Sequence, residues 1–279
     1  MSTVTITAAE VNKLRQQTGA GMMDCKKALM EANGDFEAAI DYLRKKGQKV
    51  AANRSDKEAN EGIVIAGTTP DGKHGAMIMI SCETDFVAKN AEFMTEANAL
   101  LQLAIDSKPA DLETLKGLKI GNGTVSEKLF DLIGKIGEKI DLNAYEHISA
   151  EKVIAYNHPG NKLASMVGFN ASPAGIEEVG KDVAMQIAAM APVAIDKDDV
   201  DSKMIEREIE IGMDQARQEG KPEAMLEKIA QGKLQKFYNE NTLLNQVFIK
   251  DEKKTIRQYL DGTHKGLTVT AFKRIRIGA

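Results

Sequence analysis

The sequence predicts an α+β protein with a small helical module, a core of two related subdomains and an inserted helical hairpin. Three observations predict this class: apolar residues at helical spacing near the N-terminus, two glycine turns that each separate apolar runs, and a late pair of amphipathic stretches. A chain of 279 residues can bury a core and form more than one domain. The expected domains are the module 1–55, the first subdomain 56–145, the second subdomain 146–200 with 240–279, and the hairpin 201–239.

The N-terminal module is expected to contain three short helices. Thr7 and Glu10 form a capping box at the start of the first helix, and Gly19 can end it in the left-handed conformation. The second helix should begin near Met22, and the third after Asp35. The second helix is expected to end at Asn33, with Gly34 as its stop, and the third is expected to end at Gly47. A module this small has little core of its own, so we expect it to dock onto another surface.

Two hairpin-plus-helix units are predicted after a polar linker at 51–61. In each unit a turn that contains glycine joins two strands, and a helix with one apolar side follows. The first unit has strands at 62–68 and 76–82, a turn at 70–72 and a helix at 91–105. The second has strands at 152–156 and 163–170, a turn at 158–161 and a helix at 176–190. Residues 111–140 look helical but less regular, and a helix at 251–260 with a strand at 267–277 should complete the second unit.

Residues 201–239 carry two apolar stripes separated by Gly220-Lys221-Pro222. The stripes consist of Ile205, Ile209, Gly212 and Ala216, and of Ala230, Leu234 and Phe237. This pattern predicts two antiparallel helices joined by a tight turn. Two interpretations stay open: the hairpin is a stabilising appendage, or it is an arm that contacts a partner.

Composition and absent motifs argue against several function classes. The net charge of −4 is not that of a chain dominated by nucleic-acid or membrane electrostatics, and no apolar run approaches the roughly 20 residues that span a bilayer. Cys25, Cys82 and the absence of a signal-peptide pattern favour a cytoplasmic location. The histidines are scattered and no Gly-Lys pair precedes Ser or Thr, so we expect no metal, no cofactor and no catalytic site. The segment Gly121–Ser126 is interpreted as a turn.

The first of two distinctive motifs runs from Leu14 to Leu29 and predicts a helix, a glycine turn and a second helix. Met22 and Met23 are adjacent and cannot both face one small core. At least one of them is therefore expected at the surface, where methionine adapts well to a partner. The alternative is that both are partly buried within the module.

The second motif, Ser81–Lys89, lies where a strand passes into a helix. Phe86 is a large aromatic residue beside Asp85 at this junction. Considered from the residues alone, a buried Phe86 with Asp85 as a helix cap is the simpler interpretation. An exposed Phe86 would instead point to a binding surface.

Both motifs resemble the two signature segments of the elongation factor Ts family, in the same order and separation. The first matches along its length, and the second keeps the Thr84-Asp85-Phe86-Val87 centre. Met79, Ser81 and Glu83 stand where the family usually has Glu, Asn and Gln. The similarity extends over nearly the whole chain.

The resemblance implies a ubiquitin-associated (UBA-like) N-terminal module, two core subdomains and a coiled-coil hairpin. It also implies a translation elongation factor that acts as a guanine nucleotide exchange factor, binds the GTPase elongation factor Tu and promotes release of GDP. Such a protein is not an enzyme, and it needs neither nucleic acid nor membrane; a dimer of heterodimers is compatible with it. Asp85 and Phe86, flanked by Thr84 and Val87, would enter the GTPase near its nucleotide. The other implied contacts are Arg15, Met22, Met23 and Lys26 in the module, and His158 in the second subdomain.

Two other function classes stay open from the residues alone. The chain could be a protein-binding scaffold that leaves nucleotide affinity unchanged. It could also be an RNA-associated protein that uses Arg44-Lys45-Lys46, Lys49 and Arg54, although no aromatic residues interleave this run to stack bases. Acceleration of GDP release by catalytic amounts of the protein would separate these classes.

Overall fold

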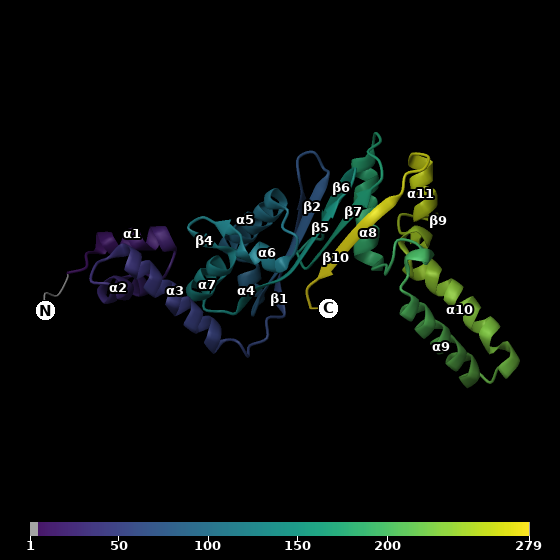
Figure 1. The fold of residues 1–279 in the computed structure, drawn as a ribbon, viewed down its shortest axis with the longest axis horizontal. Helices are drawn as coiled ribbons and strands as arrows, with labels where there is room; N and C mark the ends of the chain where they lie inside the picture. Colours follow the sequence, from purple (N-terminus) through teal and green to yellow (C-terminus); the bar gives the residue numbers. More distant parts are fainter. Residues whose placement is uncertain (1–4, 279) are drawn as a thin grey trace. The chain divides into compact units, whose positions relative to one another are not determined.

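The computed structural model describes residues 5–278, which contain both helices and strands, in agreement with the expected α+β class (Figure 1). The chain divides into two compact units. One comprises the residues up to Ile65, Ala76–Glu146 and the C-terminal end from Arg276; the other comprises Ala66–Gly75 and His147–Ile275. In the described part of the chain, every helix is too short or too polar to cross a membrane.

The N-terminal module has the predicted helices. The helices are α1 (Ala8–Thr18), α2 (Met22–Glu31) and α3 (Phe36–Asn53). The capping box of Thr7 and Glu10 begins α1, and Gly19 ends it with a φ of 67°. Asp35 caps α3 as expected, since its carboxylate accepts a hydrogen bond from Ala38 N. The small core of the module consists of Val11, Leu14, Cys25, Ala28, Leu29 and Ala39.

The predicted end of α3 at Gly47 is wrong, because the helix continues to Asn53 and takes up the start of the expected linker. A glycine inside a helix costs about 1 kcal/mol relative to alanine. Here the missing side chain allows close packing, since a Cβ atom at Gly47 would overlap the carbonyl oxygen of Phe130. Beyond the glycine, Val50 and Ala51 pack onto the core of the first unit. Tertiary contact therefore outweighs the local signal for a helix end.

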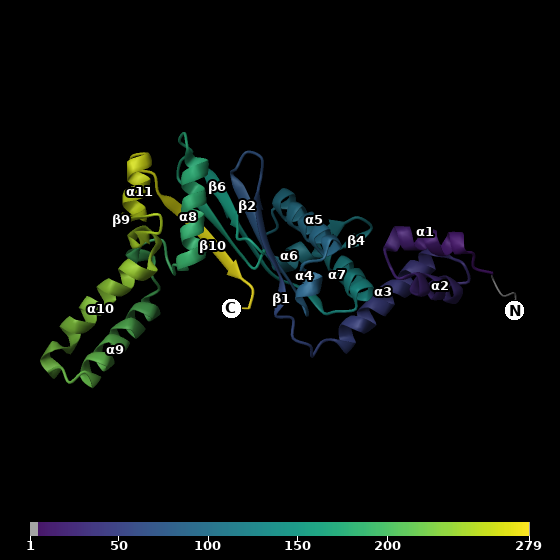
Figure 2. The ribbon, with the colours of Figure 1, turned by 180° about the vertical axis from the view of Figure 1, so that it is seen from behind.

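The first unit is built on a sheet with the strand order β1-β2-β5. Its strands are β1 (Glu61–Thr68), β2 (His74–Cys82) and β5 (Ile140–Ser149). Its other elements are α4 (Asp85–Ala88), α5 (Ala91–Ser107), α6 (Leu112–Gly117), β3 (Lys119–Ile120), β4 (Gly123–Thr124) and α7 (Val125–Ile136). Figures 1 and 2 show α5, α6 and α7 gathered on one side of the sheet, where they enclose its core.

Strand β5 was not expected from the sequence. Its buried residues, Ile140, Leu142, Tyr145 and Ile148, do not follow strict alternation, so the usual period of two is obscured. The rest of the irregular stretch agrees with the prediction, since α6 and α7 are separated by the tight turn of β3 and β4.

The second unit contains a sheet with the order β10-β7-β6, and α8 packs against it (Figure 1). Strands β6 and β7 are antiparallel, as expected of a hairpin. The elements are β6 (Lys152–Asn157), β7 (Leu163–Phe169), α8 (Ile176–Met190), α9 (Ser202–Gln218), α10 (Leu226–Asn241), β8 (Val247–Phe248), β9 (Asp251–Thr255), α11 (Ile256–Thr263) and β10 (Val269–Arg276).

The helix expected from residue 251 starts later than predicted. Asp251–Thr255 instead form β9, which pairs with β8. The helix begins only after Thr255, whose hydroxyl accepts a hydrogen bond from Gln258 N while the Gln258 side chain bonds back to Thr255 N. This capping box fixes the boundary that apolar spacing alone misplaced.

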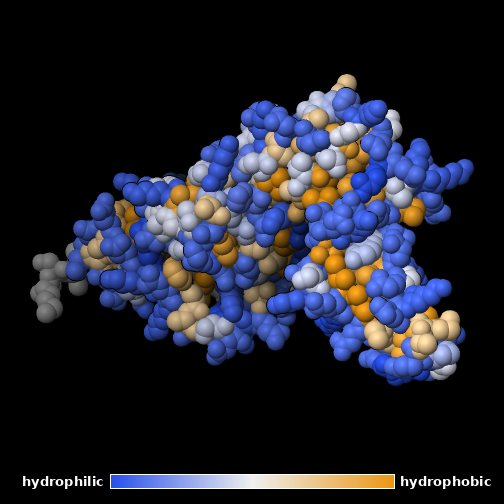
Figure 3. Space-filling view, turned by 45° about the vertical axis from the view of Figure 1, so that its right-hand side comes forward, coloured by the Kyte–Doolittle hydropathy of each residue, from blue (hydrophilic) through white to orange (hydrophobic). Residues whose placement is uncertain are grey.

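Helices α9 and α10 form the predicted helical pair. Gly212 lies against Ala230, where a Cβ atom on the glycine would be 3.2 Å from Ala230 Cα. Gly212, Ala216, Ala230 and Leu234 are buried, whereas the stripe residues nearer the open ends are only partly covered. Apolar side chains also reach the outside of the pair among hydrophilic ones (Figure 3).

Candidate partner-binding site

The one-turn helix α4 holds Phe86 in solvent at the junction between β2 and α5. The ring is 83% exposed, whereas Ala88 is buried and Val87 packs against the core. Thr84, not Asp85, is the N-cap, since its hydroxyl accepts a hydrogen bond from Val87 N at 3.4 Å. The interpretation with a buried Phe86 and Asp85 as cap is therefore wrong. The turn instead presents one large aromatic side chain outward from a buried base.

Two carboxylates hold this turn, and the sequence analysis gave a role to neither of them. Glu138 accepts hydrogen bonds from Glu83 N at 3.2 Å, from Thr84 N at 3.0 Å and from the Thr84 hydroxyl at 2.7 Å. Glu83 accepts from Lys139 N at 2.6 Å and from Arg54 Nη1 at 2.7 Å. Charge-assisted bonds of this kind are stronger than neutral ones. The backbone beneath Phe86 is thus fixed before any partner arrives.

The environment of Glu83 favours its charged form. The hydrogen bond from Lys139 N, followed by the bond and charge of Arg54, outweighs desolvation and lowers the pKa of the Glu83 carboxyl below its ordinary 4.5. A signal for this role exists in the sequence, since an acid at position 83 departs from the usual Gln of the resembled motif. Its partner Lys139 lies 56 residues away, so the contact itself could not be derived locally.

Asp85 and Cys82 flank the turn in different ways. Asp85 pairs with Lys89 at 2.6 Å on the exposed side, where such pairs contribute about 0–1 kcal/mol. Its carboxylate is thus close to the surface, beside Phe86. The Cys82 thiol is buried and donates to Thr84 O at 3.1 Å. Burial raises the pKa of Cys82 to about 11, so it is a neutral thiol near pH 7.

A second exposed apolar surface lies on α2. Met22 and Met23 are 51% and 74% exposed, so the expectation that they cannot both be buried is confirmed. Met30, 59% exposed, lies two turns along the same helix face and was missed by the sequence analysis. Lys26 and Arg15 are exposed as well. We define the methionine face as Met22, Met23, Lys26 and Met30.

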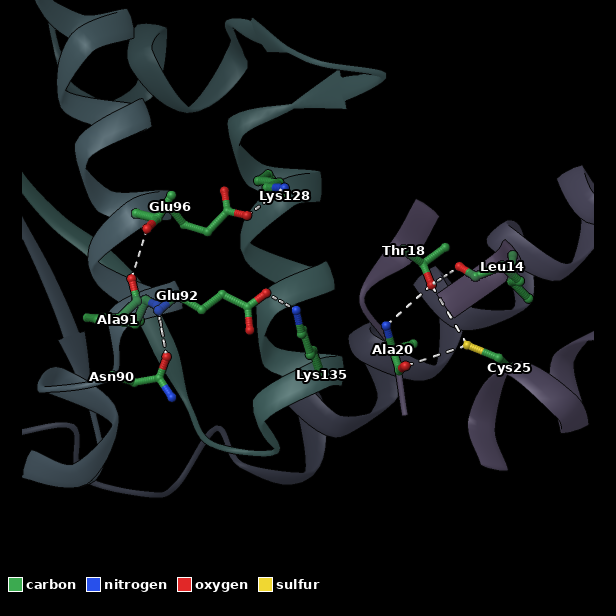
Figure 4. A network of polar contacts seen from close by, with 12 residues as sticks. Leu14, Thr18, Ala20, Cys25, Asn90, Ala91, Glu92, Glu96, Lys128 and Lys135 are labelled. Atoms are coloured by element: carbon green, nitrogen blue, oxygen red, sulfur yellow. Dashed lines mark hydrogen bonds and ion pairs between the residues drawn. The ribbon is translucent and has the colours of Figure 1, made fainter. Parts of the chain in front are cut away.

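The turn that leads into this face is internally bonded. The Thr18 hydroxyl donates to Leu14 O at 2.8 Å and accepts from Ala20 N at 3.3 Å, while the Cys25 thiol donates to Ala20 O at 3.6 Å (Figure 4). These bonds satisfy backbone groups at the end of α1 and the start of α2. They fix the direction in which α2 leaves the turn.

His158 belongs to the second unit, in the turn between β6 and β7. It is exposed, its backbone N donates to Leu163 O at 2.9 Å, and its ring Nδ1 shares a hydrogen bond with the Tyr156 hydroxyl at 3.0 Å. The imidazole is accessible but oriented by Tyr156.

Comparisons with known proteins show the family of this chain. A family model described as Elongation factor TS matches residues 83–279. A protein named Elongation factor Ts from Cytophaga hutchinsonii is 58% identical over 275 residues, 98% of this chain and 99% of that protein. Proteins with the same name from Amoebophilus asiaticus and Porphyromonas gingivalis are 54% and 51% identical, again over 98% of this chain and 99% of each relative. The chain belongs to the elongation factor Ts family.

The family model and the relatives cover different parts of the two motifs. The elongation factor Ts model begins at Glu83 and so includes the turn of Phe86 but not the helical module. The relatives cover nearly all of the chain, and therefore most of the module that carries the methionine face. Module and core thus occur together in this family.

The other expectations for an elongation factor Ts chain can be compared with the described residues. In the basic run around Arg44, Lys46 pairs with Asp24 at 2.6 Å and Arg54 pairs with Glu83, so two of its five cations are neutralised by side chains of this chain. This weighs against the RNA-associated alternative. Between residues 5 and 278, no three His, Cys, Asp or Glu side chains cluster in a way that could hold a metal ion.

Proposed function

We propose that this protein is a guanine nucleotide exchange factor of translation, which binds elongation factor Tu in its GDP form and promotes release of GDP so that GTP can bind. Membership of the elongation factor Ts family supports the role in elongation. The single observation that carries the mechanism is the exposed Phe86 on a turn fixed by Glu83 and Glu138. A rigid aromatic residue of this kind can insert into a partner with little loss of conformational entropy on binding.

The mechanism is mechanical and electrostatic. A GTPase holds the diphosphate with backbone amides, a lysine and Mg²⁺. A small displacement of these elements weakens several charge-assisted contacts together. In the proposal Phe86 is the wedge, with Asp85 beside it and Thr84 and Val87 forming its base. The factor forms and breaks no covalent bond, so it is not an enzyme in the chemical sense.

The driving force is a difference in affinity. The factor binds the distorted, nucleotide-poor GTPase better than the GDP-bound form, and this difference alone shifts the population. The coupling is reciprocal, since nucleotide weakens binding of the factor as much as the factor weakens binding of nucleotide. Incoming GTP can therefore displace the factor, and the cycle repeats.

Other surfaces supply grip in this proposal. Met22 and Met23 are adaptable apolar contacts in a UBA-like module, and Arg15 with Lys26 can pair with acidic groups at the rim. His158 contacts a different domain of elongation factor Tu. The helices α9 and α10 form a coiled-coil arm outside the basic reaction. The site of action is the cytoplasm, where elongation takes place.

The test is release of fluorescent GDP from elongation factor Tu, followed by stopped flow with the factor at one-hundredth of the GTPase concentration. We expect each factor molecule to release many GDP molecules when excess unlabelled nucleotide is present. A protein that binds the GTPase but leaves the release rate unchanged is a scaffold, and the proposal would then be rejected.

A further inference from the structure

Helix α3 connects the module to the turn of Phe86 within one compact unit. Its first half supplies Ala39 to the module core, with Ile40 and Leu43 packed around it. Its second half packs Val50 and Ala51 onto the core of sheet β1-β2-β5. At a rise of about 1.5 Å per residue its 18 residues span about 27 Å. A single helix is therefore part of two cores.

The middle of α3 crosses α7 at two glycines. A Cβ atom on Gly134 would lie 3.0 Å from Gly47 Cα, and one on Gly47 would overlap the Phe130 carbonyl oxygen. The two backbones are in direct contact, with no side chain between them. A closely packed interior does not deform continuously. The contact at the two glycines therefore fixes the distance between α3 and α7.

Polar contacts beside this crossing and at the C-terminal end of α3 add further restraints. Lys135, next to Gly134, pairs with Glu92 of α5 (Figure 4). Its ammonium also lies beside Gly19 at the end of α1, where a Cβ atom would overlap it. At the other end of α3, Arg54 bonds to Glu83 beneath the turn of Phe86. Lys135 thus ties α7 to α5 and to the end of α1, and Arg54 ties the C-terminal end of α3 to the turn of Phe86.

We infer that Gly47 and Gly134 are positioning residues that hold the methionine face and Phe86 at a fixed separation, so that one partner molecule meets both surfaces together. The inference rests on the proposed function. Two contact surfaces on a rigid body bind with a high effective concentration once the first is engaged. A module on a loose tether would have to be ordered in the complex, which costs affinity.

The test uses glycine variants of the full chain in the GDP-release assay. Gly134→Ala forces the two helices apart by a few tenths of an ångström, and Gly47→Ala by more. The half-saturating concentration of the factor should rise roughly tenfold for Gly134→Ala and further for Gly47→Ala, while the maximal rate changes less than about twofold. Gly232→Ala in α10, where nothing lies within 4 Å of the added Cβ atom, is the matched control and should change neither value.

A double-mutant cycle separates positioning from simple destabilisation. If the glycines position the methionine face, Met23→Ala should lose most of its effect in the Gly134→Ala background. The inference would be overturned if Met23→Ala and Gly134→Ala changed the half-saturating concentration by independent factors that multiply. It would also be overturned if Gly134→Ala lowered the maximal rate and left the half-saturating concentration unchanged. Gly134→Ala carries the test alone if Gly47→Ala does not fold. Failure of the unmodified chain to accelerate release would reject the proposed function itself, which this cycle does not decide.

Discussion

Phe86 presents its ring to solvent from a turn whose backbone is hydrogen-bonded to distant carboxylates. Phe86→Ala should therefore leave the stability of the free protein almost unchanged. It should remove an aromatic anchor of the kind often worth about 2 kcal/mol or more, which is about a 30-fold loss in the coupling that drives exchange. Asp85→Ala should impair exchange less, because water partly replaces the hydrogen bonds of a surface carboxylate. Stopped-flow GDP release and denaturant unfolding of each variant measure the two quantities.

Phe93 provides the matched control for Phe86. It is 1% exposed in the core of the same unit, so Phe93→Ala should cost roughly 3–5 kcal/mol of folding stability. If Phe86→Ala is destabilised like Phe93→Ala, yet exchanges normally while folded, Phe86 is structural and the wedge lies elsewhere.

The lowered pKa of Glu83 predicts how the stability of the protein depends on pH. Its folded pKa lies below 4.5, so its contribution to stability is present above that pH and is lost as pH falls through the folded pKa. Glu83→Gln should destabilise the protein by about 1 kcal/mol at pH 7, because the carboxylate bonds to Arg54 and Lys139 N lose their charge. The difference in Tm between the two proteins should shrink when pH is lowered from 6 to 3.5.

Glu252→Gln, at an exposed position on β9, is the control for charge removal as such. It should shift Tm little at either pH. A difference between wild type and Glu83→Gln that stays constant down to pH 3.5 would mean that the Glu83 charge does not hold the turn.

At the scale of the element, local signals predicted most boundaries correctly. The capping box and Gly19 end of α1, the Asn90 cap of α5, Gly175 before α8 and the two hairpin turns are local signals, and these elements lie where expected. The errors at α3 and β5 have another origin. Gly47 stays helical because α7 packs against it, and β5 is a strand because β2 pairs with it. Neither neighbour is visible in a local sequence window.

The same division applies to the site. The residues alone placed at least one of Met22 and Met23 at the surface but favoured a buried Phe86, and only the resemblance pointed to Phe86 as a contact. Glu138 was missed because it acts from 54 residues away on Thr84. The extended α3 also changes how the module can be removed. A cut after residue 55 would take Val50 and Ala51 out of the core of the first unit, so side-chain variants are the better probe.

Helices α9 and α10 are expected to be dispensable for basic exchange. Their buried residues face one another, with Gly212 against Ala230, so excision removes a largely self-contained pair. Replacement of Asp201–Asn239 by a short Gly-Ser linker retains Leu243 and Leu244, which belong to the core of the second unit. The deletion protein should fold and keep a GDP-release rate within about threefold of wild type, since no proposed contact is lost. A folded deletion protein without exchange activity would make the pair part of the grip.

At the scale of the whole molecule, grip and distortion should be separable by a thermodynamic cycle. Calorimetry gives the affinity of the factor for nucleotide-free and for GDP-bound elongation factor Tu, and the ratio of these affinities is the coupling. Met22→Ala with Met23→Ala should weaken both affinities by a similar factor, roughly tenfold, because the methionine face contributes binding to either form. The coupling would then be unchanged.

Phe86→Ala should change the same cycle differently. A wedge interacts favourably only with the displaced form of the GTPase, so its loss should weaken binding to the nucleotide-free form by about 30-fold and leave the weaker GDP-bound affinity nearly constant. The coupling should fall by the same factor, and the GDP affinity measured with saturating factor should rise correspondingly, as reciprocity requires. If Phe86→Ala weakened binding to the nucleotide-free and GDP-bound forms by the same factor, Phe86 would contribute affinity only, as the methionines do. The preference for the nucleotide-poor state would then have to come from another part of the molecule.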